Sequence, residues 1–234
     1  MYASVETKYI RPMSIGMELQ RTAAIKQVNV KEGKAGLMAF IVMRDEFSDH
    51  AGPVVSEDTT YVFLTDEASL GAAPAVKSEI PLQDTYHRRI VPSPVLLFRY
   101  SALTFNAHRI HYDAVYTTQV EGHRGLVVHG PLTFTLLLDH VRGVISDKTG
   151  SVGDAVALLG DGTRILRSSV RAMAPLYLKP DGSGLASDTA EGSGELTLVA
   201  RVARKDPESV TLAVGAYGAD GQMAMGGEVM VGQA

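Results

Sequence analysis

The sequence predicts an α+β fold in which an antiparallel sheet wraps one long buried helix. Residues 132–145 are apolar on almost every face of a helix, which is typical of a helix buried all round. Three β-like stretches follow at residues 168–178, 194–204 and 209–217, with a final strand at residues 223–231. The turns between them have lengths suited to an antiparallel meander. A buried helix wrapped by such a sheet describes the hot-dog architecture.

The amino-terminal part of the sequence is typical of strands. Residues 20–31 and 37–44 are rich in β-forming residues and flank a turn at residues 31–36, so we predict a β-hairpin there. Residues 61–64, after a polar loop, predict a further short strand. Because no buried-helix pattern occurs here, we expect a first unit that is partial or whose helix comes from another chain.

A change of composition divides the chain. After the first strands, Gly and Pro are scattered among Ala, Ser and charged residues, which indicates a linker. We therefore expect a partial amino-terminal unit at residues 1–75, a linker at residues 76–94, and a carboxy-terminal unit at residues 95–234.

Composition and charge exclude several classes of protein. The chain has 234 residues and a net charge of -4 with a pI near 6.0, which argues against nucleic acid as the main partner, because phosphate binding favours a basic face. The apolar runs fall short of the roughly 20 residues that span a bilayer, and the start lacks the apolar segment of a secretory signal. The absence of Cys fits a reducing compartment. We expect a soluble, cytoplasmic protein that binds neither nucleic acid nor membrane.

Ionisable side chains concentrate directly before the apolar helix and on it. Five of the seven histidines lie in this region: His108, His111, His123, His129 and His140. Near neutral pH, histidine is the natural side chain for proton transfer. The turn at residues 125–131 follows at a distance that lets the fold bring it beside the histidines. The region is therefore the expected place of chemistry.

Two motifs in this region carry a resemblance to a known family. Residues 98–113 read FRYSALTFNAHRIHYD and residues 125–132 read GLVVHGPL. With them the sequence resembles the MaoC-like, R-specific enoyl-thioester hydratase and dehydratase superfamily. It is most similar to the branch of mesaconyl-, methylfumaryl- and itaconyl-CoA hydratases and 3-hydroxyacyl-thioester dehydratases. Weaker similarity extends through residues 171–177 and 220–225, and residues 28–44 resemble the closing strands of the amino-terminal hot dog in these proteins. The resemblance implies a double hot dog with a partial first unit.

The resemblance also implies an activity and a base. The expected reaction is the reversible, cofactor-independent hydration of a 2-enoyl-CoA thioester to a 3-hydroxyacyl-CoA thioester, with a C4–C5 dicarboxylyl-CoA such as mesaconyl-CoA as one possible substrate. His111 takes the role of the base, for which an imidazole pKa near 6.5 is suited. The wider superfamily has an Asp five residues before this histidine, whereas this chain has Asn106, and His108 stands where an Asn is usual. We expect Asn106 to position the water that His111 deprotonates.

The turn at residues 125–131 leads into the buried helix, whose first N–H groups are unpaired and whose dipole is positive at that end. We expect a thioester oxygen to be bound there. The residues expected to contact substrate are Tyr100, His108, Val128, His129 and Gly130, with Arg99 and Arg109 as candidates for a free carboxylate or the carrier phosphates.

Other interpretations of these residues stay open. The simpler interpretation gives His123 and His140 structural roles. It makes Asp113 the cap of a helical turn that begins at Ala114. No metal site is expected, because His108 and His111 lack a third ligand. A non-catalytic acyl-CoA-binding or scaffold subunit and an acyl-CoA thioesterase are the alternative functions. In either case we expect a homodimer or a higher homo-oligomer, because an incomplete first unit leaves sheet edges that need covering.

Overall fold

The computed structural model describes residues 1–33, 36–64, 80–187 and 194–233. In this part of the chain, nine strands form one antiparallel sheet in the order β2-β3-β4-β1-β6-β9-β8-β7-β5. The strands are β1 (Tyr2–Tyr9), β2 (Gln20–Gly33), β3 (Gly36–Asp49), β4 (Gly52–Leu64), β5 (Tyr86–Ile90), β6 (Arg164–Ala172), β7 (Leu196–Asp206), β8 (Ser209–Tyr217) and β9 (Met223–Gly232). The sheet is continuous from the first strands of the chain to the last.

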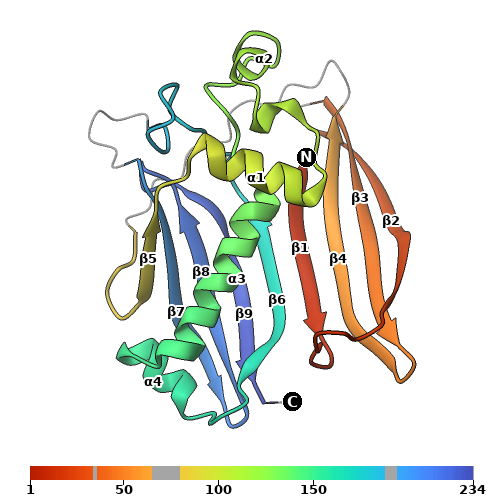
Figure 1. The fold of residues 1–234 in the computed structure, drawn as a ribbon, viewed down its shortest axis with the longest axis vertical. Helices are drawn as coiled ribbons and strands as arrows, with labels where there is room; N and C mark the ends of the chain where they lie inside the picture. The colour runs from red at the N-terminus through yellow and green to blue at the C-terminus, as the bar shows by residue number, and fades with distance from the viewer. Residues whose placement is uncertain (34–35, 65–79, 188–193, 234) are drawn as a thin grey trace.

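The helices lie on one side of this sheet (Figure 1). They are α1 (Pro94–Thr104), the 3-10 helix η1 (Arg109–His111), α2 (Ala114–Gln119), α3 (Gly130–Asp147) and α4 (Gly150–Ala157). Figure 1 shows α3 running diagonally across β6 to β9, with α1 crossing its amino-terminal end, while β2, β3 and β4 extend to one side of it. A hot-dog-like α+β fold, with a central helix against an antiparallel sheet, is thus confirmed.

α3 has a proline in its first turn and buries one face. Pro131 stands in its first turn, where a missing N–H costs no hydrogen bond. Leu137, Val141 and Val144 are fully buried in the hydrophobic core that the carboxy-terminal strands complete. The expectation of burial on every face is wrong, because Thr135 is exposed and the neighbouring apolar side chains are half-buried. This outer face lines an open groove of about 810 Å³.

The two predicted units share the sheet through β1 and β6. β1 pairs with β4 on one side and with β6 on the other, both antiparallel. The predicted hairpin is confirmed as β2 and β3, and the short strand at residues 61–64 is the end of the longer β4. Residues 34–35, in the predicted turn, lie outside the described residues. The strand β1 was not expected from the sequence.

The predicted linker at residues 76–94 needs a correction. Within it, β5 pairs with the edge strand β7, from Tyr86 opposite Ala200 to Ile90 opposite Leu196. α1 then begins at Pro94, with the hydroxyl of Ser93 accepting a hydrogen bond from the third residue of the helix. A charged strand can lie at a sheet edge, where one side of its backbone faces solvent. Residues 65–79, before and at the start of the predicted linker, lie outside the described residues.

The predicted strand at residues 168–178 is correct in its first half only. β6 ends at Ala172, and the chain leaves the sheet before Pro175. Proline has no N–H to donate to a strand ladder, which accounts for the exit. Beyond it, Tyr177 forms an isolated antiparallel bridge with Val127. The chain after β6 therefore supports the turn before α3 and does not continue the sheet.

His140 joins α3 to β5 and gives the fold a pH dependence. The ring is fully buried, and its Nε2 donates to the carbonyl oxygen of Tyr86 at 3.0 Å. Burial, with Arg88 and His87 nearby, lowers the pKa of His140 to about 4, against the opposing effects of the Tyr86 hydrogen bond and Asp139. A histidine whose pKa is depressed on folding binds its proton preferentially in the unfolded state, so stability is lost as pH falls below about 6.5.

We expect His140→Gln to weaken this pH dependence. Between pH 7.5 and pH 5.0 the wild-type protein should lose about 2 kcal/mol more of its unfolding free energy than the variant, because about 1.4 kcal/mol per pH unit is linked to one histidine. Urea unfolding at the two pH values measures the difference. Leu137→Ala is the control. It should lower the unfolding free energy by about 2–5 kcal/mol at both pH values, so the difference between the two pH values should stay that of the wild-type protein. An unchanged pH difference in His140→Gln would contradict the assignment.

Candidate active site

The two sequence motifs meet at Val127. Its N–H donates to the carbonyl oxygen of Ile110 at 2.9 Å, and its carbonyl oxygen lies 2.7 Å from Nδ1 of His111. The turn at residues 125–131 is therefore hydrogen-bonded through both main-chain groups of one residue to the segment that carries the histidines. The expectation that the fold brings these two pieces together is confirmed.

Local backbone geometry sets the path of the first motif. α1 ends at Phe105, whose φ of 54° places it in the left-handed region that stops a helix. The carbonyl oxygen of the Asn106 side chain accepts from the N–H of His108 at 3.1 Å, which closes a tight turn before η1. Asp113 then caps α2 by accepting from the N–H of Tyr116 at 3.0 Å. The predicted capping role of Asp113 is confirmed.

His111 lies at the end of η1 with 8% of its surface exposed. Because a carbonyl oxygen can only accept, the hydrogen bond to Val127 requires the proton on Nδ1. Nε2 of the neutral ring is then bare and able to accept a proton. Burial and the nearby His108 lower the pKa of His111, and the hydrogen bond to Val127 opposes them. The lowered pKa favours the neutral form of the ring.

His108 stands at the edge of the same site. The ring is exposed and meets the His111 ring edge to face, with centroids 5.7 Å apart and an angle of 87° between the ring planes. The backbone of Asn106 is held by Ser101, whose carbonyl oxygen accepts from its N–H at 2.9 Å. The structure thus gathers Asn106, His108 and His111 in one turn, as the sequence suggests.

His129 lies behind His111 and has no exposed surface. The two imidazole rings are stacked, with centroids 3.6 Å apart and planes inclined by 16°. Nε2 of His129 lies 2.9 Å from the hydroxyl oxygen of Ser101, and Tyr100 meets the ring edge-on at 5.0 Å. Burial, with a smaller effect of His111, lowers the pKa of His129 to about 3. The His129 ring is enclosed, and the contact of His129 with substrate stays a prediction.

Two glycines let the turn run close to its neighbours. A Cβ on Gly125 would lie 2.2 Å from the carbonyl oxygen of Leu178, so no other residue fits there without a shift of the backbone. Gly130 opens α3, and a Cβ there would lie 2.7 Å from the ring of Tyr2. Because Pro131 has no N–H, the unpaired amides of the first turn belong to Gly130 and Leu132. These amides form the positive end of the helix dipole.

The remaining predicted contacts differ in their surroundings. Val128 is buried, and its N–H donates to the carbonyl oxygen of Leu176 at 2.8 Å, so it anchors the turn. Arg109 is bound to Asp113, with Nη2 and Oδ2 2.7 Å apart, and stacks over Tyr116 at 4.0 Å. Its guanidinium is therefore engaged within its own segment. Arg99 lies on the exposed surface of α1, in the turn that also carries Tyr100.

Sequence reasoning missed three contributors to this site. They are Ser101, which acts through its hydroxyl, Val127, which acts through main-chain groups, and Tyr2, which acts through a packed ring. None of them is a histidine, the residue type that drew attention to this region. The signal available for Ser101 was its place in the first motif. No local sequence pattern identifies Tyr2, because β1 contacts α3 only once the sheet has formed.

The other histidines of the cluster have structural surroundings. The ring of His123 lies 5.7 Å from the ring of Tyr177.

Among the described residues, no group of three or more His, Asp or Glu side chains is arranged to bind a metal ion. In the same part of the chain, none of the helices combines the length and the apolar character needed to cross a membrane.

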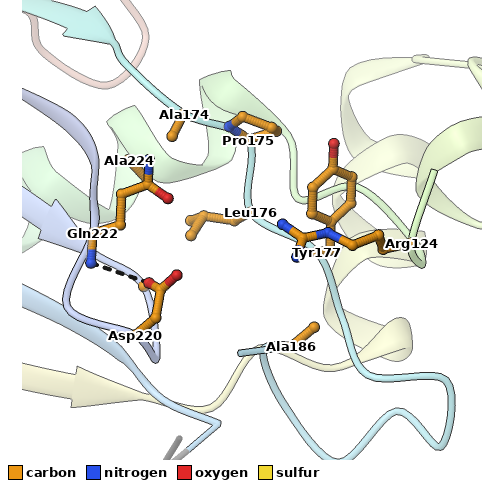
Figure 2. A pocket seen from close by; sticks show the side chains of 10 residues that line it. Arg124, Ala174, Pro175, Leu176, Tyr177, Ala186, Asp220, Gln222 and Ala224 are labelled. Atoms are coloured by element: carbon orange, nitrogen blue, oxygen red, sulfur yellow. Dashed lines mark hydrogen bonds between the residues drawn. The ribbon is translucent and has the colours of Figure 1, made fainter. Parts of the chain in front are cut away.

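A small pocket lies beside the segment that supports the turn. It has a volume of about 20 Å³ and lies between Tyr177 and the β8–β9 turn, where the N–H of Gln222 donates to Asp220 at 3.0 Å (Figure 2). The guanidinium of Arg124 stacks over the Tyr177 ring at 5.2 Å. This volume fits about one water molecule. Neither this pocket nor the groove beside α3 is lined by His111.

Residues 1–153 match the family model of hydroxyacyl-thioester dehydratase type 2. Mesaconyl-C(4)-CoA hydratase of Chloroflexus aurantiacus is 39% identical over 142 residues, which cover 61% of this chain and 50% of that protein. The mitochondrial hydroxyacyl-thioester dehydratase type 2 of Schizosaccharomyces pombe is 38% identical over 90 residues, which cover 38% of this chain and 29% of that protein. The chain thus spans half or less of the length of these curated relatives.

Solved structures share the fold at low sequence identity. A MaoC-like dehydratase superposes with a TM-score of 0.72 at 16% identity, covering 100% of this chain and 75% of that chain. A MaoC-like dehydratase from Phytophthora capsici superposes with a TM-score of 0.61 at 17% identity, covering 100% of this chain and 68% of the other. The same arrangement of strands and helices is therefore found in both.

Proposed function

Because the chain belongs to the hydroxyacyl-thioester dehydratase type 2 family, we propose that it reversibly hydrates a 2-enoyl-CoA thioester to the 3-hydroxyacyl-CoA thioester. The resemblance inferred from residues 98–113 and 125–132 is confirmed by this membership, since the matched region contains both motifs. The observation that carries the proposed activity is the bare Nε2 of His111, fixed by the hydrogen bond from Nδ1–H to Val127.

His111 acts as the base and then as the acid. Its Nε2 accepts a proton from water while the water oxygen bonds to the β-carbon of the enoyl group, and the electrons of the double bond move toward the thioester oxygen. The imidazolium then returns the proton to the α-carbon, so that one water molecule is added and the base is regenerated. A lowered pKa of His111 suits this role, because the ring must be neutral before each turnover.

The start of α3 supplies the positive end for the enolate. α3 begins at Gly130, directly after His129, and the amides of Gly130 and Leu132 in its first turn have no partner within the helix. A thioester oxygen bound there gains stabilisation as negative charge develops on it. In enzymes with comparable amide donors, losing one donor costs about 10²- to 10³-fold in rate.

Asn106 positions the water in this proposal. Its side-chain oxygen is used by the N–H of His108, which leaves the NH₂ group to donate to the water oxygen. An amide cannot take up the proton, so the chemical role stays with His111. His108 lies exposed against the His111 ring, and we assign it to substrate contact.

We propose that the substrate carries a second carboxylate, as in a C4–C5 dicarboxylyl-CoA. The support is the 39% identity to a protein named mesaconyl-C(4)-CoA hydratase, together with the exposed Arg99 on the helix that contacts His129. Of the two arginines considered, Arg109 is bound to Asp113. Arg99 is therefore the residue assigned to the carboxylate.

We propose that residues 1–75 form a partial first hot dog, that residues 95–234 form the second hot dog, to which β5 adds an edge strand, and that a homodimer covers the first. Val28 pairs with Ile41, which pairs with Tyr61, and these side chains share one face of the sheet. That face continues through Tyr2 toward α3. Val28 is 54% exposed, which is unfavourable for an apolar side chain on a sheet face.

The activity test uses purified protein with crotonyl-, mesaconyl- and itaconyl-CoA and follows the enoyl-thioester absorbance. We expect His111→Gln to lower kcat by about 10²- to 10⁴-fold, because proton transfer is lost. His50→Gln, at an exposed position far along the sequence from the motifs, is the matched control and should keep wild-type rates. Full activity of His111→Gln would remove the mechanism.

The same assay separates the alternative functions. An acyl-CoA-binding subunit would be stabilised by these thioesters in a thermal-shift measurement without turnover. A thioesterase would release free thiol, which a thiol reagent detects. Either result in place of hydration would refute the proposed reaction.

We expect Arg99→Gln to raise KM for mesaconyl-CoA about 10-fold or more and to leave KM for crotonyl-CoA near its wild-type value. The reason is that a guanidinium binds a carboxylate through two hydrogen bonds, whereas crotonyl-CoA offers none on its acyl group. Equal effects on both substrates would show that Arg99 acts on the shared carrier or on the fold.

Light scattering after gel filtration tests the homodimer. We expect about twice the 25.0 kDa of one chain for the wild-type protein, and about one chain for Val28→Lys, because a buried charge without a partner opposes association. Leu158→Lys, at a residue that is 83% exposed at the end of α4, is the control and should stay dimeric. A monomeric wild-type protein would contradict the proposal.

A further inference from the structure

We propose that His129, anchored by Ser101, is a positioning residue that sets the ring plane of His111 and so aims Nε2 at the substrate. The inference deepens the proposed function, since it assigns a support to the base of that reaction. It starts from the stacking of two imidazoles at 3.6 Å, of which only His111 reaches the surface.

One hydrogen bond cannot orient the His111 ring by itself. The bond from Nδ1–H to the Val127 oxygen holds one atom of the ring, but it does not by itself prevent rotation about the Cβ–Cγ bond, which would carry Nδ1 away from that oxygen and break the bond. A second ring lying parallel to the first, with 16° between the planes, blocks that rotation on one face. His108 meets the ring edge to face. The direction of Nε2 is thus set by the hydrogen bond and the stack together.

The His129 ring is itself held from α1. Its Nε2 lies 2.9 Å from the hydroxyl of Ser101, which is 5% exposed, and the adjacent Tyr100 packs edge-on against it. Its backbone stands immediately before α3 and is fixed by the helix that follows. The order of support therefore runs from α1 through Ser101 and His129 to His111.

Stability alone does not account for a histidine at this place. Nδ1 of His129 is buried without a hydrogen-bond partner among the described residues, which is a cost that a leucine would not carry. Burial also keeps the ring uncharged, since it lowers the pKa of His129 to about 3. A neutral, flat, anchored ring gives His111 a rigid surface without placing a positive charge beneath it.

Three variants separate positioning from packing. His129→Leu fills the space without an orphan nitrogen, Ser101→Ala removes the anchor, and His129→Gln keeps a planar amide that can reach Ser101. We expect kcat to fall about 10- to 100-fold in His129→Leu and Ser101→Ala with KM within about 2-fold, because small displacements of a catalytic group cost rates of this order. His129→Gln should recover part of the loss. His50→Gln is the control.

Thermal unfolding shows which explanation holds. We expect His129→Leu to have an unfolding midpoint equal to or above that of the wild-type protein while kcat falls. A loss of kcat that follows a loss of folded protein, or wild-type kcat in a stable His129→Leu variant, would overturn the proposal.

A second readout needs no turnover. Long-range proton–nitrogen NMR spectra report which nitrogen of His111 carries the proton, and we expect Nδ1 alone in the wild-type protein at pH 7, with exchange between Nδ1 and Nε2 in His129→Leu. An unchanged His111 signature in that variant would overturn the positioning role even if the wild-type protein hydrates no thioester. Failure of the proposed reaction would instead show as absent turnover with the NMR difference still present.

Discussion

The hydrogen bond between Nδ1–H of His111 and the carbonyl oxygen of Val127 joins the two segments on which the site depends. The N–H of the same residue donates to the carbonyl oxygen of Ile110, so the turn and η1 cannot move apart without losing both bonds. This bond also decides the tautomer of His111 and therefore which nitrogen is basic. Main-chain geometry therefore determines which nitrogen of the His111 side chain can accept a proton.

The fold provides this geometry by placing different elements at one end of α3. α1 contributes the Ser101 hydroxyl, the turn before α3 contributes His129 and the helix amides, and β1 packs Tyr2 against Gly130. Burial and the nearby His108 disfavour a positive charge on the His111 ring, which lowers its pKa.

The features that depend on local sequence patterns could be predicted from the sequence alone. The apolar run at residues 132–145 predicted α3, alternating residues predicted the β2–β3 hairpin, and the bunched histidines identified the segment around His111. The stack of His111 and His129 could not be predicted, because the two residues are 18 positions apart and their contact depends on the Val127 bridge. β5 escaped for a similar reason: its pairing with β7 stabilises a charged segment that has no strand pattern of its own.

The contacts of Gly125 and its neighbours show that residues outside the region matched by the family model support the site. The carbonyl oxygen of Leu178 occupies the space that a side chain at Gly125 would need, and Leu176 and Leu178 form hydrogen bonds with Val128 and Leu126. These partners lie beyond residue 153, where the match to the family model ends. The turn that accepts the hydrogen bond of His111 is therefore held by a stretch of chain beyond the match to the family model, so a fragment delimited by that match alone would lack this support.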